Sequence, residues 1–129
     1  MTQTIQVVAI GGTTRPNSSS EKALRIAAQA SKDAGAQVSF ITGADLLMPI
    51  YDTQSTERAA ESLHLIEQIR NADGVLISSP GYHGGMSGLI KNAIDYLEDL
   101  SGDRRPYLDG RAVGCVAVAH GWQASVTTL

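Results

Sequence analysis

The chain has little cysteine, few aromatic residues and no block of like charge. Cys115 is its only cysteine, so no internal disulfide can form, which favours a reducing compartment. Ten Lys and Arg residues are scattered among 13 Asp and Glu, which leaves a net charge of −3 and no basic surface for nucleic acid. No apolar run approaches the roughly 20 residues that span a bilayer, and the N-terminal segment does not resemble a signal peptide. We therefore expect a cytoplasmic protein without nucleic-acid or membrane partners.

Short apolar runs alternate with segments of helical periodicity. Four runs, several of them rich in β-branched residues, predict strands at residues 5–10, 36–42, 74–79 and 112–119. Between them, apolar residues recur at helical spacing from Ser18 to Gly35 and over residues 57–71 and 88–100. This βαβαβαβ order predicts a parallel sheet covered by helices on both faces. At 129 residues, 43% of them hydrophobic, the chain is expected to form one domain, residues 1–129, around one core.

Local signals predict several element boundaries. Ser18 and Glu21 match a capping box at the start of the first helix. Pro80 is expected to end the third strand. In the second helix, a buried stripe is expected from Ala59, Leu63, Ile66 and Ile69.

The segment after Ala119 is too short for a full helix and a further strand, because only residues 120–129 remain. A doubly wound sheet of this kind usually has five strands. We expect either a truncated or partly ordered version of the fold, or a sheet edge that a partner completes.

The loop after the first predicted strand, GGTTRPNSSS at residues 11–20, combines two glycines, five hydroxyl groups and Arg15. The glycines allow a sharp turn, and the following helix would direct free N–H groups to the same place. A phosphate site fits this composition, and so does a serine-rich helix cap with a solvated arginine. The loop matches neither a dinucleotide fingerprint nor a P-loop, so a terminal monophosphate suits it better than a pyrophosphate.

Two further loops should lie at the same sheet edge, because the carboxyl ends of parallel strands meet there. Residues 78–88, SSPGYHGGMSG, offer bare backbone amides at four glycines, with Tyr82 and His83 able to stack on a flat ring or bond its edge. The third loop carries Trp122, the only tryptophan. This residue is either a buried or oligomer-facing anchor, or a side chain that narrows access to a ligand.

Two of these segments resemble motifs of the NADPH-dependent FMN reductase family. GGTTRPNSSSEKAL is similar to that family's phosphate loop, G-S-x-R-x-x-S followed by a helix. SSPGYHGGMSGLIKNAIDYL is similar to its second motif, P-x-Y-[NH]-x-x-x-x-G-x-[LI]-K-N-A-[IL]-D, and residues 48–51 resemble its L-P-x-Y loop. The resemblance extends over residues 5–121. It implies a flavodoxin-like doubly wound parallel sheet in three α/β/α layers, with the last strand and helix missing from this chain.

The resemblance also implies the site residues. The FMN phosphate would be held by Thr13, Arg15, Ser18 and Ser20. The isoalloxazine ring would be lined by Pro80, Gly81, Tyr82, His83 and Gly84, with Gly121 near it. Thr13 replaces the usual serine, Gly81 stands where many relatives have Glu, and His83 where many have Asn. Lys91, Asn92 and Asp95 of the second motif fall inside a helix and are interpreted as structural.

The function implied is transfer of a hydride from NADPH, or from NADH, to FMN and then to a second acceptor such as free flavin or a quinone. The chemistry would belong to the cofactor, so no catalytic side chain is assigned. Members of the family it resembles form dimers or tetramers, so the resemblance implies a homodimer or homotetramer.

Other functions remain open at this point. A non-enzymatic flavodoxin-type electron carrier is one, although such carriers tend to be strongly acidic; a flavin-binding module is another. A metal site is disfavoured because neither a carboxylate nor a cysteine joins His83 and His120 at ligand spacing. No G-x-S-x-G elbow occurs, and Cys115 lies among apolar residues, where a reactive thiol is not expected.

Overall fold

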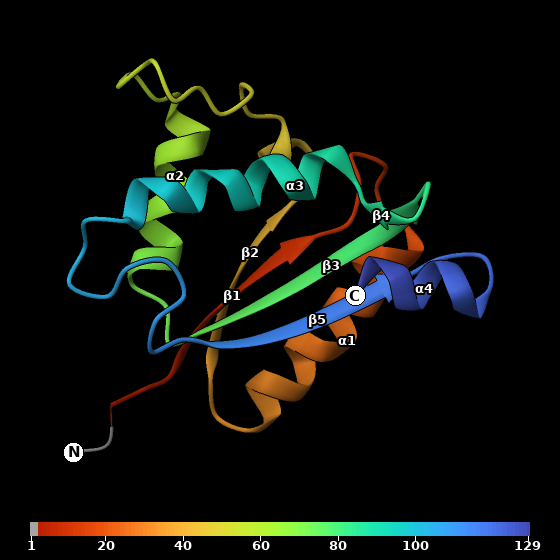
Figure 1. Cartoon of the computed structure of the whole chain (residues 1–129). Coiled ribbons are helices and arrows are strands. Elements are labelled where there is room, and N and C mark those ends of the chain that lie inside the picture. The colour runs from red at the N-terminus through yellow and green to blue at the C-terminus, as the bar shows by residue number, and fades with distance from the viewer. Residues whose placement is uncertain (1–2) are drawn as a thin grey trace.

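A parallel sheet forms the middle layer of the computed structural model, which describes residues 3–129 (Figure 1). Its strands are β1 (Gln6–Gly11), β2 (Gln37–Thr42), β3 (Gly74–Tyr82) and β5 (Ala112–Val118), and a short β4 (Gly85–Met86) pairs antiparallel with β3. The parallel strands stand in the order β2-β1-β3-β5. The chain winds outward from β1 in both directions, so the topological switch point, where such sheets bind ligands, lies at the carboxyl ends of β1 and β3.

Helices cover both faces of the sheet, as the alternating pattern predicts. Helix α1 (Ser19–Asp33) packs on one face, and α2 (Ala60–Arg70) and α3 (Gly88–Asp95) on the other (Figure 1). Two 3₁₀ helices, η1 (Gly43–Leu46) and η2 (Tyr96–Leu100), extend the connections. The last helix, α4 (Trp122–Thr128), contacts β3, β4 and β5 near their carboxyl ends. The predicted three-layer flavodoxin-like fold is confirmed, and no strand follows β5 within residues 3–129.

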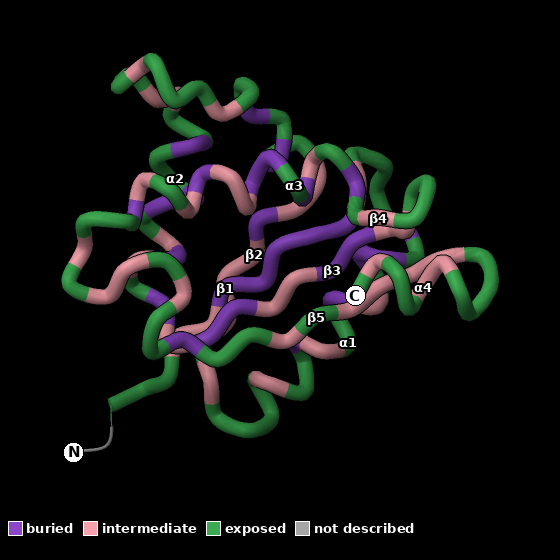
Figure 2. The backbone as a smooth tube through the Cα atoms, in the orientation of Figure 1, coloured by how far each residue is buried: buried purple, intermediate pink, exposed green. Residues whose placement is uncertain are grey.

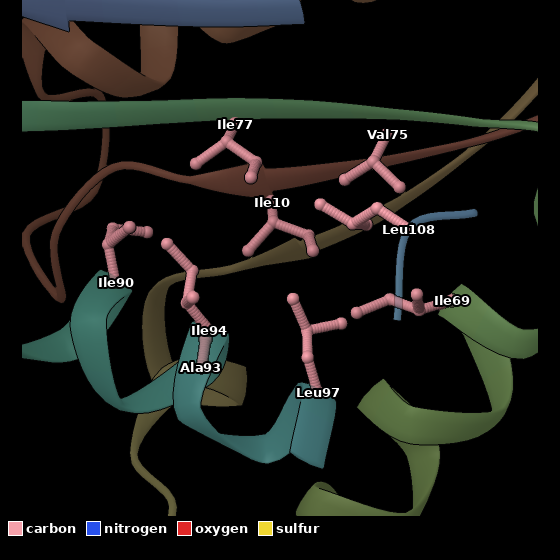
Figure 3. Close-up of a pocket in the computed structure, with 9 residues that line it drawn as sticks. All are labelled: Ile10, Ile69, Val75, Ile77, Ile90, Ala93, Ile94, Leu97 and Leu108. Carbon is pink, nitrogen blue, oxygen red and sulfur yellow. The ribbon is translucent and has the colours of Figure 1, made fainter. Parts of the chain in front are cut away.

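The two central strands carry the core, and Figure 2 shows β1 and β3 as its most buried stretches. Val8 and Ile10 face α2 and α3, whereas Ala9 faces Leu24 and Ala28 of α1. A gap of about 10 Å³ remains in the larger core (Figure 3). Only aliphatic side chains line it: Ile10, Ile69, Val75, Ile77, Ile90, Ala93, Ile94, Leu97 and Leu108. It offers no polar group to a ligand and is at the lower limit for one water molecule.

Helix α1 begins as its capping box predicts, with one change in partner. The Glu21 amide donates to Ser18 Oγ at 3.2 Å. The Glu21 carboxylate accepts from the Asn17 amide at 3.1 Å instead of from the Ser18 amide. The carboxylate thereby fastens the loop that precedes the helix.

Strand β3 runs through Pro80 to Tyr82, so the prediction that Pro80 ends it is wrong. Strand β1 stops opposite Ser78, so beyond that residue β3 has lost its partner on one side. A missing N–H is tolerated where a strand has a free side.

The buried stripe of α2 also differs from the prediction. The helix begins at Ala60 and buries Ser62, Leu65, Ile66 and Ile69, while Leu63 is 55% exposed. The buried residues of α2 still recur every three or four positions. The first of them is Ser62, which a pattern based on apolar residues does not include.

Cys115, which the sequence places among apolar residues, is exposed, and the expectation that its thiol is unreactive stays a prediction. Strand β5 pairs with β3 alone, and all of its residues are exposed or only partly buried.

Candidate functional site

The loop after β1 is pressed against β3 at its first residue. Gly11 has a φ of +156°, and a Cβ added there would lie 2.3 Å from the Ser78 carbonyl oxygen. The Gly12 amide donates to that same oxygen at 3.1 Å. A larger residue at position 11 would therefore separate β1 from β3 where the two loops begin.

Unpaired donors remain at the start of α1. The Ser19 and Ser20 amides donate no hydrogen bond to residues 3–129, as expected of the first turn of a helix. The exposed Arg15 guanidinium forms no ion pair or hydrogen bond within the same range. The loop therefore carries an unpaired cation, and the free amides that follow it lie at the positive end of a 15-residue helix.

The predicted phosphate-holding hydroxyls differ in their surroundings. Thr13 Oγ1 accepts from the Arg15 amide at 3.1 Å, which folds the loop locally. Ser18 and Ser20 are each 2% exposed, and their hydroxyl oxygens lie 3.3 Å apart. Since Ser18 Oγ already caps α1, its contact with a ligand phosphate stays a prediction, as do those of Thr13, Arg15 and Ser20.

Ser78 and Glu21 also shape this loop, although neither was predicted as a site residue. Ser78 Oγ donates to the Ser20 carbonyl at 2.8 Å, which fixes the start of α1 against β3. Glu21 is buried, and its carboxylate lies 3.7 Å from the Arg25 guanidinium. The capping-box spacing points to Glu21 from sequence, whereas Ser78 becomes visible only when β1 and β3 are aligned.

The loop after β3 is a tight hairpin. His83 and Gly84 form its turn, and both have positive φ, at +51° and +85°. Two successive positive φ values are the condition for a type I′ turn, in which Asn-Gly is the favoured pair. An Asn at position 83, as the family motif allows, would suit this turn. Tyr82, His83 and Gly84 are exposed, and Tyr82 is 52% accessible.

The hairpin and α4 border a shallow, open cleft at the carboxyl edge of the sheet. Its lining residues are Gly84, His120, Gly121, Trp122, Gln123, Ala124 and Thr127. The cleft brings together Gly84 and Gly121, both of which the family resemblance implies to lie near one ligand ring. A Cβ at either glycine would meet no atom within 4 Å, so bare backbone faces open space.

Gly81 is covered by α4 on the side where a side chain would point. A Cβ there would lie 2.7 Å from Thr128 Oγ1 and 2.9 Å from Ala119 Cβ. A glutamate side chain at this position would have no room while α4 is so placed. The roles of Pro80 and Gly81 beside a ring stay predictions.

Residues 47–59, which we call the clamped loop, are fixed to α3 and η2. The Tyr51 amide donates to Asn92 Oδ1 at 2.9 Å, and Asn92 Nδ2 donates to the Pro49 carbonyl at 3.0 Å. Tyr96 Oη donates to the same carbonyl at 2.7 Å. The structural interpretation of Asn92 is thus supported by its contacts.

An ion pair closes the clamped loop. Arg58 donates to both carboxylate oxygens of Asp99, at 2.6 and 2.9 Å, and Tyr51 Oη donates to Asp99 at 3.2 Å. The hydrogen bonds from Arg58 hold the pKa of the Asp99 carboxyl below its usual value. Burial and the adjacent Asp99 raise the pKa of the Tyr51 phenol.

No group of three or more His, Cys, Asp or Glu side chains within residues 3–129 is placed to hold a metal ion. None of the helices in this range is long and apolar enough to cross a membrane.

The sheet order and the loops at its switch point define a flavodoxin-like α/β domain. Two solved structures share this fold: an NADH:FMN oxidoreductase in its apo form, at a TM-score of 0.74, and the flavoenzyme NAD(P)H:(acceptor) oxidoreductase of Paracoccus denitrificans, at 0.73. They are 22% and 19% identical to this chain, cover 96% and 98% of it, and are themselves covered to 63% and 66%.

The chain belongs to the NADPH-dependent FMN reductase family, whose model matches residues 5–129. It is 31% identical to an NADPH azoreductase of Bacillus sp. (strain OY1-2) over 83 residues, which is 64% of this chain and 43% of that protein. It is 36% identical to a quinone reductase of Escherichia coli (strain K12) over 104 residues, 78% of this chain and 54% of that protein. The chain thus spans about half the length of the curated relatives it matches.

Proposed function

We propose that this chain binds FMN and catalyses NADPH-dependent reduction of a small-molecule acceptor. The observation that carries the proposal is the pair of free amides at Ser19 and Ser20, together with the unpaired Arg15 of the same loop. Fixed N–H donors and a planar cation suit a monophosphate, whose charge and several oxygens need such partners. These groups stand at the switch point of the sheet, next to a loop that the family motif matches.

The flavin ring would occupy the cleft between Gly84 and Gly121. The phosphate loop follows β1 and the Gly121 loop follows β5, with β3 between them. The two loops are therefore separated by two strand spacings, about 10 Å, which suits a ligand with its phosphate at one end and its ring at the other. The open space beside both glycines lets backbone approach a flat ring without steric conflict.

When bound, FMN would supply the redox chemistry, taking two electrons as a hydride from NADPH or NADH and passing them to the acceptor. This chain's residues would hold and orient the phosphate and the ring and restrict water at the cleft. No side chain needs to act as a general acid or base. Relatives named azoreductase, quinone reductase and FMN reductase place azo compounds, quinones and free flavin among the acceptors to test.

We further propose a cytoplasmic homodimer or homotetramer. The family resemblance supports association, and the single cysteine, which can close no internal disulfide, supports a reducing compartment.

Two titrations and one rate measurement test the proposed function. Quenching of flavin fluorescence should give much tighter binding of FMN than of riboflavin, which lacks the phosphate. NADPH oxidation should then require both the protein and FMN. Equal affinity for the two flavins would contradict the phosphate site, and FMN binding without NADPH oxidation would favour the electron carrier or the binding module.

A further inference from the structure

Trp122 is placed unusually for the only tryptophan of a small domain. Its side chain is 80% exposed, although tryptophan is normally largely buried. It begins α4, which buries none of its residues, so the indole contributes little to the core. Of the alternatives predicted for Trp122, the buried anchor is therefore wrong, and the oligomer-facing anchor stays a prediction.

The cleft beside Trp122 has a distinct chemical character. Besides the indole, its lining offers the imidazole of His120, the amide of Gln123 and the hydroxyl of Thr127, with bare backbone at Gly84 and Gly121. Neither a carboxylate nor a Lys or Arg side chain lines it. An aromatic face with a few neutral hydrogen-bonding groups suits an uncharged planar molecule that carries carbonyl oxygens.

We propose that Trp122 is the residue on which the electron acceptor stacks, and that it makes the site selective for uncharged planar acceptors of the quinone type over anionic, non-planar ones. This inference rests on the proposed function, because the acceptor must meet the same cleft as the flavin ring. Trp122 acts as a positioning residue: it holds the acceptor and takes no part in the transfer of electrons or protons.

Binding can be read directly, because all tryptophan fluorescence of the chain comes from Trp122. The protein with excess FMN is titrated with 1,4-naphthoquinone, and FMN binding is measured separately from flavin fluorescence. Saturable quenching of the indole is expected. Quenching that rises linearly without saturation would overturn the proposal, whether or not FMN binds or NADPH is oxidised. Failure of the proposed function would show instead in the flavin titration and the NADPH assay.

Steady-state kinetics then tests selectivity. Trp122→Ala should raise the KM for 1,4-naphthoquinone about tenfold, the loss expected for one stacking contact, and should change the KM for ferricyanide less than about twofold. Trp122→Phe should restore most of the affinity, because it keeps an aromatic face. Val126→Ala, at another exposed position of α4, is the matched control and should behave like the unmodified protein.

Two outcomes would overturn the proposal that Trp122 makes the site selective for uncharged planar acceptors. One is an equal change in KM for both acceptors. The other is a change in the molar mass of the assembly with both KM values unchanged, which would assign Trp122 to contacts between copies of the chain. FMN affinity should stay within about twofold in Val126→Ala, since Val126 does not line the cleft.

Discussion

Polar groups in the clamped loop have hydrogen-bond partners, whereas several donors in the loops at the carboxyl edge of the sheet have none. In the clamped loop, Asn92, Tyr96 and Asp99 satisfy the backbone and side-chain groups around Tyr51. At the carboxyl edge, the Arg15 guanidinium and the first amides of α1 have no partner within residues 3–129. Paired groups stabilise the fold, whereas unpaired donors at a ligand-binding edge are available for a ligand. The family motifs contain both kinds of residue, and their contacts separate the two roles.

The largest effect on stability should come from the clamped loop. Asn92→Ala removes a side chain that is 7% exposed and leaves the Tyr51 amide and the Pro49 and Met48 carbonyls with fewer partners. We expect urea denaturation to show a loss of about 2–4 kcal/mol. The control is Asn71→Ala, which removes an exposed asparagine at the end of α2 and should cost about 1 kcal/mol or less. Similar losses of unfolding free energy in Asn92→Ala and Asn71→Ala would contradict the claim that Asn92 stabilises the clamped loop.

Gly84→Val should oppose FMN binding at the hairpin. The added side chain would enter the space where the ring is proposed to lie, and overpacking of this kind costs about 1–3 kcal/mol. The substitution also strains a backbone with a φ of +85°. Gly35→Val is the matched control. The φ of Gly35 is +101°, and a Cβ there would meet no atom within 4 Å. Gly35 lies between α1 and β2, at the amino-terminal end of the strand and away from the proposed site. Both should lose similar stability in a thermal melt, and only Gly84→Val should lose FMN affinity; equal affinities would rule out this position for the ring.

Arg15→Ala should weaken FMN binding by about 1–3 kcal/mol, the range for a hydrogen bond to a charged group. The free energy of unfolding of Arg15→Ala should equal that of the unmodified protein, because the Arg15 guanidinium forms no ion pair or hydrogen bond within the described chain. The comparison is with Arg104→Ala, which removes the same charge from an exposed loop before β5. A flavin titration that gives one affinity for both variants and the unmodified protein would exclude Arg15 from the phosphate site.

The smallest effect should be the acid dependence of the clamped loop. Because Arg58 lowers the pKa of Asp99 in the folded protein, the carboxyl binds fewer protons there than in the unfolded chain. Its contribution to stability, about 1 kcal/mol, is present above its ordinary pKa of roughly 3.9 and is lost as the pH falls toward the folded value.

Asp99→Asn should therefore reduce stability at pH 7 and converge with the unmodified protein at low pH, as followed by urea denaturation at several pH values. Asp95→Asn, which removes an exposed pair with Lys91, should change stability by less than about 0.5 kcal/mol. A constant gap between Asp99→Asn and the unmodified protein at every pH would contradict the assignment.

The sequence predicted what depends on local pattern. The alternation of strands and helices, the cap at Ser18 and the loops at the carboxyl edge follow from residues close together in the chain. Long-range pairing decided the rest. Pro80 stays in β3 because β1 has ended beside it, and Gly81 is confined by α4, some forty residues later. The sequence left Trp122 either an anchor or a side chain beside the ligand, and only the placement of α4, which buries none of its residues, excludes the buried anchor.

The measurement that tests the central claim most directly is the absorption spectrum of the purified protein, loaded with FMN and freed of excess, before and after anaerobic addition of NADPH. The account predicts that flavin bands remain with the protein and that NADPH bleaches them faster than it bleaches free FMN. Protein that retains no flavin, or bound flavin that NADPH reduces no faster than free FMN, would contradict it.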